Sequence, residues 1–122
     1  MDNQKKLLIL VDDNPANLRI GKNVLMEKYT VATAPSAAKL FSLLENNRPV
    51  VILLDIDMPE MDGFTALEIL KSKPETKDIP VVFLTGMTEN QDVEKGRALG
   101  AVDFITKPFD PPTLISCIEK YS

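Results

Sequence analysis

The sequence of 122 residues contains no histidine, no tryptophan and a single cysteine. Histidine is the usual side chain of acid–base catalysis near neutral pH and, with cysteine, the usual ligand of zinc, so both functions are nearly excluded. Cys117 alone cannot form an internal disulfide, and its apolar helical surroundings predict a buried thiol in a reducing compartment.

Long apolar runs and clusters of positive charge are also missing. No run approaches the roughly 20 residues of a membrane span, and the N-terminal apolar run is too short for a signal peptide. The net charge is −4, and no basic cluster is longer than Lys5-Lys6, which argues against direct contact with nucleic acid. We therefore expect one cytoplasmic domain that contacts neither a membrane nor DNA.

One stretch organises the chain, the segment PVVILLDIDMPEMDG at residues 49–63. Its apolar run is too short for an independent helix and does not alternate, so it predicts a parallel strand buried on both faces. Asp55 stands where the run stops, at the carboxyl end of the predicted sheet, where open α/β folds bind ligands. Asp57 follows in the loop, as do Glu60 and Asp62, which we interpret as solvated charges. This concentration of negative charge at the end of one strand predicts a bound cation.

The rest of the chain alternates short apolar runs with amphipathic segments. Parallel strands need crossover helices, and nearly all crossovers are right-handed, so we predict an α/β fold, a doubly wound (βα)5 sheet with helices on both faces. The helix at residues 90–99 is poor in apolar residues, which leaves one face available for a partner. The expected strands are 7–11, 30–34, 50–54, 80–84 and 101–106, and the expected helices are 15–29, 37–46, 64–71, 90–99 and 111–121.

Asp12 and Asp13 follow the first predicted strand as Asp55 follows the third. If these strands are neighbours, the carboxylates share one crevice, where each like-charge pair at about 4 Å costs roughly 4 kcal/mol at an effective dielectric of ~20. Oxygen ligands suit Mg²⁺ or Mn²⁺, whose shell is normally completed by water and a phosphoryl oxygen. A carboxylate can accept that phosphoryl group as an aspartyl phosphate. Thr85 and Lys107, at the ends of the fourth and fifth strands, are candidate donors on the same rim.

This ordered set resembles the receiver (CheY-like) domain of two-component response regulators, over about residues 6–121. That family has an acidic pair after the first strand, a phosphoacceptor Asp after the third, a Ser/Thr after the fourth and a Lys-Pro after the fifth. The resemblance implies one receiver domain with a flavodoxin-like sheet in strand order 2-1-3-4-5. The matching residues are Asp12-Asp13, Asp55, Thr85 and Lys107-Pro108.

By this resemblance, Asp55 accepts a phosphoryl group from a histidine kinase or a histidine phosphotransfer protein. The reaction is Mg²⁺-dependent and self-catalysed, and slow autodephosphorylation follows, so the domain is not a conventional enzyme. Asp13, Asp55 and the backbone carbonyl of Asp57 bind the metal directly, and Asp12 lies near it or acts through water. Asp57 and Met87 occupy the positions that tune phosphoryl lifetime in the family.

The resemblance also assigns the switch. Lys107 contacts the phosphate, the Lys107-Pro108 bond is cis, and Thr85 moves to hydrogen-bond the phosphate. Phe104 stands where the family keeps a switch aromatic. The signal then passes through the helix Asn90–Leu99, the fifth strand and the last helix to an output domain or protein partner, or to a dimer that forms on phosphorylation.

Other interpretations compete with this one. A receiver-like module that binds partners without phosphorylation is one. A phosphatase of the haloacid dehalogenase type is another, since Asp55-Ile56-Asp57 resembles its DxD motif, although Met58-Pro59 departs from that motif and its nucleophile follows the first strand. Taken singly, Asp13 and Thr85 are ordinary caps, Lys107 is a solvated lysine and Phe104 is a core residue.

Overall fold

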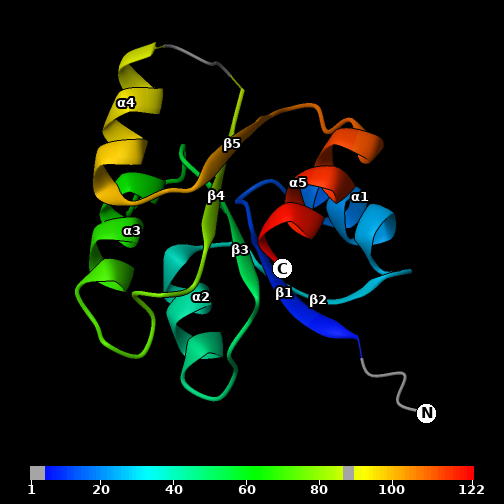
Figure 1. Ribbon diagram of the computed structural model, residues 1–122, viewed down its shortest axis with the longest axis horizontal. Coiled ribbons are helices and arrows are strands. Elements are labelled where there is room, and N and C mark those ends of the chain that lie inside the picture. Colours follow the sequence, from blue (N-terminus) through cyan, green and yellow to red (C-terminus); the bar gives the residue numbers. More distant parts are fainter. Residues whose placement is uncertain (1–4, 87–89) are drawn as a thin grey trace.

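The computed structural model of the protein describes residues 5–86 and 90–122. All strand pairs are parallel, in the order β2-β1-β3-β4-β5, which confirms the predicted doubly wound sheet. Helices α2, α3 and α4 cover one face of the sheet, and α1 and α5 cover the other (Figure 1). The elements are β1 (Lys6–Val11), α1 (Pro15–Leu25), β2 (Tyr29–Ala34), α2 (Ala37–Leu44), β3 (Val51–Asp55), α3 (Gly63–Lys71), β4 (Val81–Thr85), α4 (Asn90–Leu99), β5 (Asp103–Thr106) and α5 (Pro111–Tyr121).

Strand β3 lies in the middle of the sheet and is buried along its whole length. Its side chains alternate between two apolar clusters, as the pleat of a strand requires. Leu54 belongs to the cluster under α2 and α3, and Leu53 belongs to the cluster under α1 and α5. Because both faces are covered, every position up to the end of the strand is apolar, and the first polar side chain appears where the strand stops.

Polar side chains cap the helices that surround the site. Asn14 accepts a hydrogen bond from the backbone N–H of Ala16 at the start of α1. Asp62, which the sequence suggested was only a solvated charge, is exposed but caps α3 by accepting from the N–H of Thr65 at 2.8 Å. Capped first turns fix the entry of each helix beside the strand that precedes it.

Three predicted boundaries are wrong by two residues or more. Helix α2 ends at Leu44, not at Asn46, because the N–H groups of Glu45 and Asn46 donate only three residues back, in turns. Helix α1 ends at Leu25, not at Tyr29, because Tyr29 is buried in the first position of β2, paired with Lys6 of β1. Strand β5 begins at Asp103, not at Ala101, because the N–H of Ala101 still closes the end of α4 by donating to the carbonyl of Gly96. None of the helices within the described ranges is long and apolar enough to cross a membrane.

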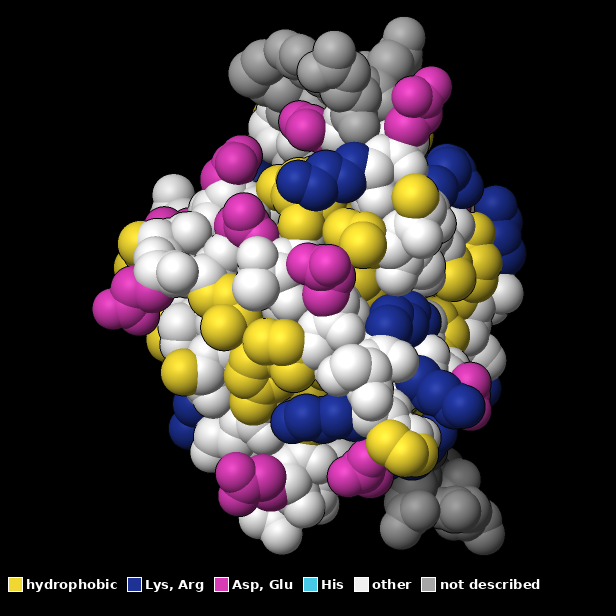
Figure 2. Space-filling model, turned by 90° about the vertical axis from the view of Figure 1, so that its left-hand side faces the viewer, with side chains coloured by type: hydrophobic (Ala, Val, Ile, Leu, Met, Phe, Trp, Pro, Cys, Tyr) yellow, Lys and Arg dark blue, Asp and Glu magenta, His cyan; other side chains and the backbone are white. Residues whose placement is uncertain are grey.

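The face formed by α2, α3 and α4 is mixed in character. Apolar side chains gather there in patches separated by charged groups of both signs (Figure 2). Within the part of α4 whose side chains are described, only Gly96 is buried. The approach of α4 at this buried residue is close, because a Cβ atom at Gly96 would lie 2.7 Å from Cζ of Phe104.

Candidate functional site

Three carboxylates converge at the carboxyl edge of the sheet. Strands β1 and β3 pair in parallel with Val11 opposite Leu54, so the residues after these partners emerge side by side. One carboxylate oxygen each from Asp12, Asp13 and Asp55 lies within 4.8 Å of the others. Asp12 and Asp55 are 0% and 1% exposed, whereas Asp13 is exposed to solvent. The site thus has a buried floor and one open side.

Asp12 is held by hydrogen bonds on both oxygens. Its Oδ1 accepts from the backbone N–H of Asn14 at 2.9 Å. Its Oδ2 accepts from Nδ2 of Asn17 and from Nζ of Lys107, each at 3.2 Å. A buried polar group needs such partners, and Asp12 receives them from the start of α1 and from the end of β5.

Asp55 shares the same lysine. Nζ of Lys107 lies 3.1 Å from its Oδ1, and the backbone N–H of Asp57 donates to that oxygen at 3.2 Å. The N–H of Lys107 donates to the carbonyl of Thr85, which ties the end of β5 to the end of β4, and the Lys107–Pro108 peptide bond is cis. One ammonium group therefore bridges two buried carboxylates.

The loop after Asp55 folds back tightly onto β3. The N–H of Gly63 donates to the carbonyl of Ile56 at 2.8 Å. A Cβ atom at Gly63 would lie 2.5 Å from the carbonyl oxygen of Asp55, so only glycine permits this approach. Glu60 has a left-handed backbone with φ 70° within this loop. The loop at residues 59–63 thus brings the chain back to the end of β3, so α3 begins beside the three carboxylates.

The surroundings of Asp55 favour neutralisation of its carboxylate, by a proton or by a bound cation. Burial and then the charge of Asp12 raise the pKa of Asp55 to about 7, although Lys107 and the N–H of Asp57 act in the opposite direction. Burial alone lowers the pKa of Lys107, but its hydrogen bonds and charge interactions with Asp55 and Asp12 outweigh burial and raise that pKa. With one cation for two buried carboxylates, the site carries an excess of negative charge.

The donor set fits a hard divalent cation. Mg²⁺ binds oxygen at about 2.1 Å in octahedral geometry, which puts opposite ligands about 4.2 Å apart. The oxygens of Asp12, Asp13 and Asp55 lie within 4.8 Å of one another, and adjacent ligands of one Mg²⁺ lie roughly 3 Å apart, so the carboxylates must draw closer to share an ion. The exposed side at Asp13 gives access to the water that Mg²⁺ retains.

The other predicted residues lie at different distances from this cluster. Thr85 ends β4 beside Thr106 of β5 and is buried on the same rim. Phe104 lies elsewhere, half-buried in β5, with its ring 5.7 Å from that of Phe83. Met87 falls outside the described residues.

Asn17 is a contact that the sequence analysis missed. The available signal was a second amide three residues after the cap Asn14, on the turn of α1 that enters beside the rim.

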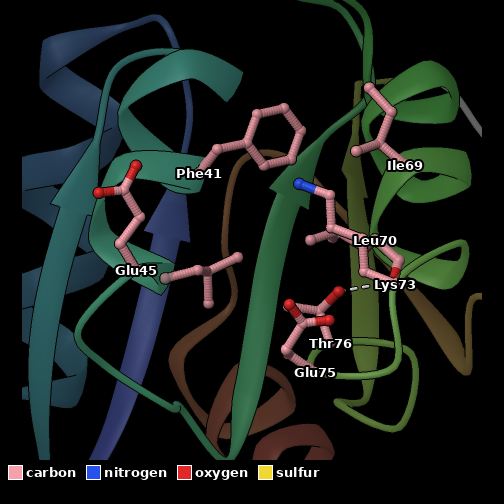
Figure 3. Close-up of a pocket in the computed structure, with 8 residues that line it drawn as sticks. Phe41, Glu45, Ile69, Leu70, Lys73, Glu75 and Thr76 are labelled. Atoms are coloured by element: carbon pink, nitrogen blue, oxygen red, sulfur yellow. Dashed lines mark hydrogen bonds between the residues drawn. The ribbon is translucent and has the colours of Figure 1, made fainter.

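A separate hollow lies between α2 and α3, and its lining has no cluster of three carboxylates like the one at the sheet edge. Its volume is about 180 Å³, and Figure 3 shows Phe41 and Ile69 extending into it from facing helices, with the Lys73 amine nearby. Thr76 closes one end by donating from Oγ1 to the carbonyl of Leu70 at 2.6 Å. Among the described residues, the only group of three potential metal ligands is the one at the sheet edge.

The family comparison agrees with this geometry. Residues 8–119 match the family described as the response regulator receiver domain. The response regulator PleD of Caulobacter vibrioides is 40% identical over 113 residues, which cover 92% of this chain and 25% of PleD. The chain thus spans about a quarter of the length of that relative.

Solved structures show the same architecture. The chemotaxis protein CheY4 of Vibrio cholerae superposes with a TM-score of 0.92 at 27% identity, covering 97% of this chain and 99% of that one. The receiver domain of the sensor histidine kinase PA1611 of Pseudomonas aeruginosa, described with a magnesium ion coordinated in its active-site cleft, gives 0.87 at 24% identity, covering 96% and 97%. This second likeness concerns the fold.

Proposed function

The chain belongs to the family of response regulator receiver domains, which act in two-component signalling, and we propose that Asp55 is its phosphoacceptor. The observation that carries the proposal is the buried Asp55 carboxylate at the end of β3, bridged by Lys107 to Asp12 at the only three-carboxylate cluster of the described residues. The phosphatase alternative places its nucleophile after the first strand, whereas Asp55 ends the third.

Phosphoryl transfer here is a displacement at phosphorus. A carboxylate oxygen of Asp55 forms the new bond to phosphorus while the bond from phosphorus to the donor breaks. With a phosphohistidine donor, the electron pair of that bond stays on the imidazole nitrogen, which takes up a proton. Lys107, already 3.1 Å from Asp55, can follow the transferred group and balance its added charge of about −1.5 to −2. Such transfer depends mainly on positioning and charge stabilisation, and this site offers both.

We propose that Mg²⁺, with Mn²⁺ as a substitute, is the cofactor. Asp13 and Asp55 would hold it together with the backbone carbonyl of Asp57, and Asp12 would act nearby or through water. When bound, the ion supplies positive charge that offsets the carboxylates and the phosphoryl oxygens. In PA1611, which shares the fold, the cleft holds magnesium.

The proposed switch couples this rim to α4. Thr85 would turn toward the phosphoryl group, and Phe104 would change its packing. Phe104 lies against Gly96, the only buried residue among the described residues of α4. A modest change there can move α4 relative to β5, the edge strand that α5 also contacts.

The partners follow from the family. Receiver domains interact with histidine kinases, and we propose a histidine kinase or a histidine phosphotransfer protein as donor for Asp55. An output domain, a protein partner or a dimer formed on phosphorylation would read the face of α4, β5 and α5. A cytoplasmic location remains a prediction of the sequence.

Intact-mass measurement tests the proposal. The wild type and Asp55→Asn are incubated with acetyl phosphate or phosphoramidate, with Mg²⁺ or with EDTA. We expect the wild type alone to gain one phosphoryl group, and only with Mg²⁺. No gain with any donor, in a folded protein, would reject the phosphoacceptor role and favour a binding module that works without phosphorylation. Repeated turnover of phosphate esters would instead indicate a phosphatase.

A further inference from the structure

Asn17 is the one side chain other than Lys107 that donates a hydrogen bond to Asp12 within the described ranges. It is the third residue of α1, is half-buried, and places Nδ2 3.2 Å from Oδ2 of Asp12. The cap Asn14 fixes the first turn of the helix, so the direction of Asn17 toward the acidic edge is set by the backbone. Asn17 thus reaches the proposed metal site without being one of its ligands.

The number of hydrogen bonds that the Asp12 carboxylate can accept indicates the role of Asn17. An ionised carboxylate accepts about four hydrogen bonds. Three are in place: the N–H of Asn14 on Oδ1, and Asn17 and Lys107 on Oδ2. Because Asp12 is 0% exposed, bulk water does not replace a lost donor. One position remains for a cation or for its bound water.

The two donors on Oδ2 differ in charge, and this difference matters for a cation. Lys107 neutralises Asp12 and so competes with a divalent ion for the same negative charge. Asn17 is neutral, so it can orient the carboxylate without lowering the charge offered to the ion. In the proposed function, Lys107 moves to the phosphoryl group and leaves Oδ2. Among the described side chains, Asn17 is then the only one that still donates a hydrogen bond to Asp12.

We propose that Asn17 is a positioning residue that keeps the Asp12 carboxylate directed at the divalent cation when Lys107 turns toward the phosphoryl group. The inference rests on the proposed function of Asp55. Removing a residue that hydrogen-bonds to a metal-binding side chain and orients it commonly weakens metal affinity by about 10- to 100-fold.

The test measures Mg²⁺ affinity by calorimetry with no phosphodonor present, since the chain has no tryptophan to report binding. Asn17→Leu removes the donor and keeps the branched shape of the side chain, with the same number of heavy atoms. Asn23→Leu, on the exposed side of the same helix, is the matched control. Both variants are also made in a Lys107→Met background, where Asn17 is the one side-chain donor to Asp12 that remains among the described residues.

We expect Asn17→Leu to weaken Mg²⁺ binding about threefold with Lys107 present and about tenfold in the Lys107→Met background, while Asn23→Leu matches its parent in both. A purely structural role would lower the thermal unfolding temperature and leave the Mg²⁺ affinity unchanged. Equal affinities for the Asn17 and Asn23 variants in both backgrounds would overturn the inference.

Two further measurements keep the result interpretable. Asn17→Ala, which introduces no bulk, is used if Asn17→Leu does not fold, and the same weakening is expected. Wild-type protein is tested for Mg²⁺ binding and phosphorylation in parallel. Failure of the wild type in both would reject the proposed function itself. A wild type that succeeds, with an Asn17→Ala variant of equal Mg²⁺ affinity, would reject only the role of Asn17.

Discussion

Leu54 and Asp55 are neighbours at the end of β3 and are almost equally buried, at 0% and 1% exposure. Leu54 packs into the apolar cluster under α2 and α3, where removal from water stabilises the fold. Asp55 faces Asp12 and Lys107, where removal from water opposes ionisation and raises its pKa to about 7. Equal burial therefore stabilises the protein at one residue and destabilises it at the next.

The contrast separates the two tasks of the central strands. The interior of the sheet supplies the free energy of folding, and the rim uses part of it to keep charged groups close together. The repulsion among the carboxylates at the rim is reduced because Lys107 bridges Asp12 and Asp55, and a divalent cation can offset the remaining negative charge. Substitutions on the two sides of this boundary should therefore change stability in opposite directions.

Replacing Leu54 with Ala should produce the largest loss of stability. The substitution removes buried methyl groups and leaves a cavity in a fully covered strand, so we expect the free energy of unfolding to fall by about 3 kcal/mol. Urea denaturation followed by circular dichroism measures the change. Ile20→Ala, at a side chain that is 50% exposed on α1, should change it by less than about 0.5 kcal/mol. Similar losses for both would show that the interior is not the source of stability.

Replacing Asp55 with Asn should have the opposite sign. The pKa of Asp55 is about 7 in the folded protein and about 4 when unfolded, so the folded state binds more protons between these values. Wild-type stability in EDTA must then fall as pH rises from about 4 to about 7. Asp55→Asn lacks this loss, and we expect it to be more stable than the wild type by about 2–4 kcal/mol at pH 8, where the upper value corresponds to the full difference between the two pKa values, with little difference near pH 4.

Urea denaturation across this pH range provides the measurement, and Glu27→Gln, at an exposed position outside the site, provides the control. The control should follow the wild type at every pH. A wild type that gains stability between about pH 4 and about pH 7 relative to Asp55→Asn would contradict the raised pKa. Added Mg²⁺ should stabilise the wild type and reduce the advantage of Asn, since a ligand that binds only the folded state favours it.

Replacing Gly96 with Ala extends the comparison to α4. The added methyl group would lie 2.7 Å from Cζ of Phe104 and 2.9 Å from Cε2 of Phe83. Crowding of this kind costs about 1–3 kcal/mol, against a gain of up to about 1 kcal/mol in helix propensity, so we expect a net loss of about 1 kcal/mol. Aromatic NMR shifts should show Phe104 displaced. In a Phe104→Leu background, Gly96→Ala should lower the free energy of unfolding by less. An equal loss in both backgrounds would mean that crowding against Phe104 is not its cause.

Much of this boundary could be predicted from the sequence. The unbroken apolar runs identify β1, β3 and β4, and the aspartates that follow two of them identify the acidic edge, because buried parallel strands admit no charge before they end. The end of α1 was misjudged because the segment before Tyr29 continues without a glycine or proline, so only pairing with β1 shows where β2 begins.

The remaining features depend on three-dimensional contacts. That β1 lies beside β3 is a property of the whole sheet, and local sequence does not contain it. The hydrogen bond from Asn17 to Asp12 joins residues only five apart, but it depends on how α1 is rotated about its axis relative to the end of β1. The cap formed by Asp62 likewise depends on the return of the loop through Gly63. The sequence thus predicts which residues carry charge and not which donors hold them.

Replacing Asp13 with Asn should change stability least and so isolates burial from charge. Asp13 belongs to the same cluster as Asp55 but is exposed, so water already solvates its carboxylate. We expect the free energy of unfolding in EDTA to change by less than about 0.5 kcal/mol at pH 8. Mg²⁺ affinity, measured by calorimetry, should nevertheless fall at least about tenfold, because a charged ligand is lost. If Asp13→Asn stabilised the protein as much as Asp55→Asn, charge repulsion alone, and not burial, would set the cost of the rim.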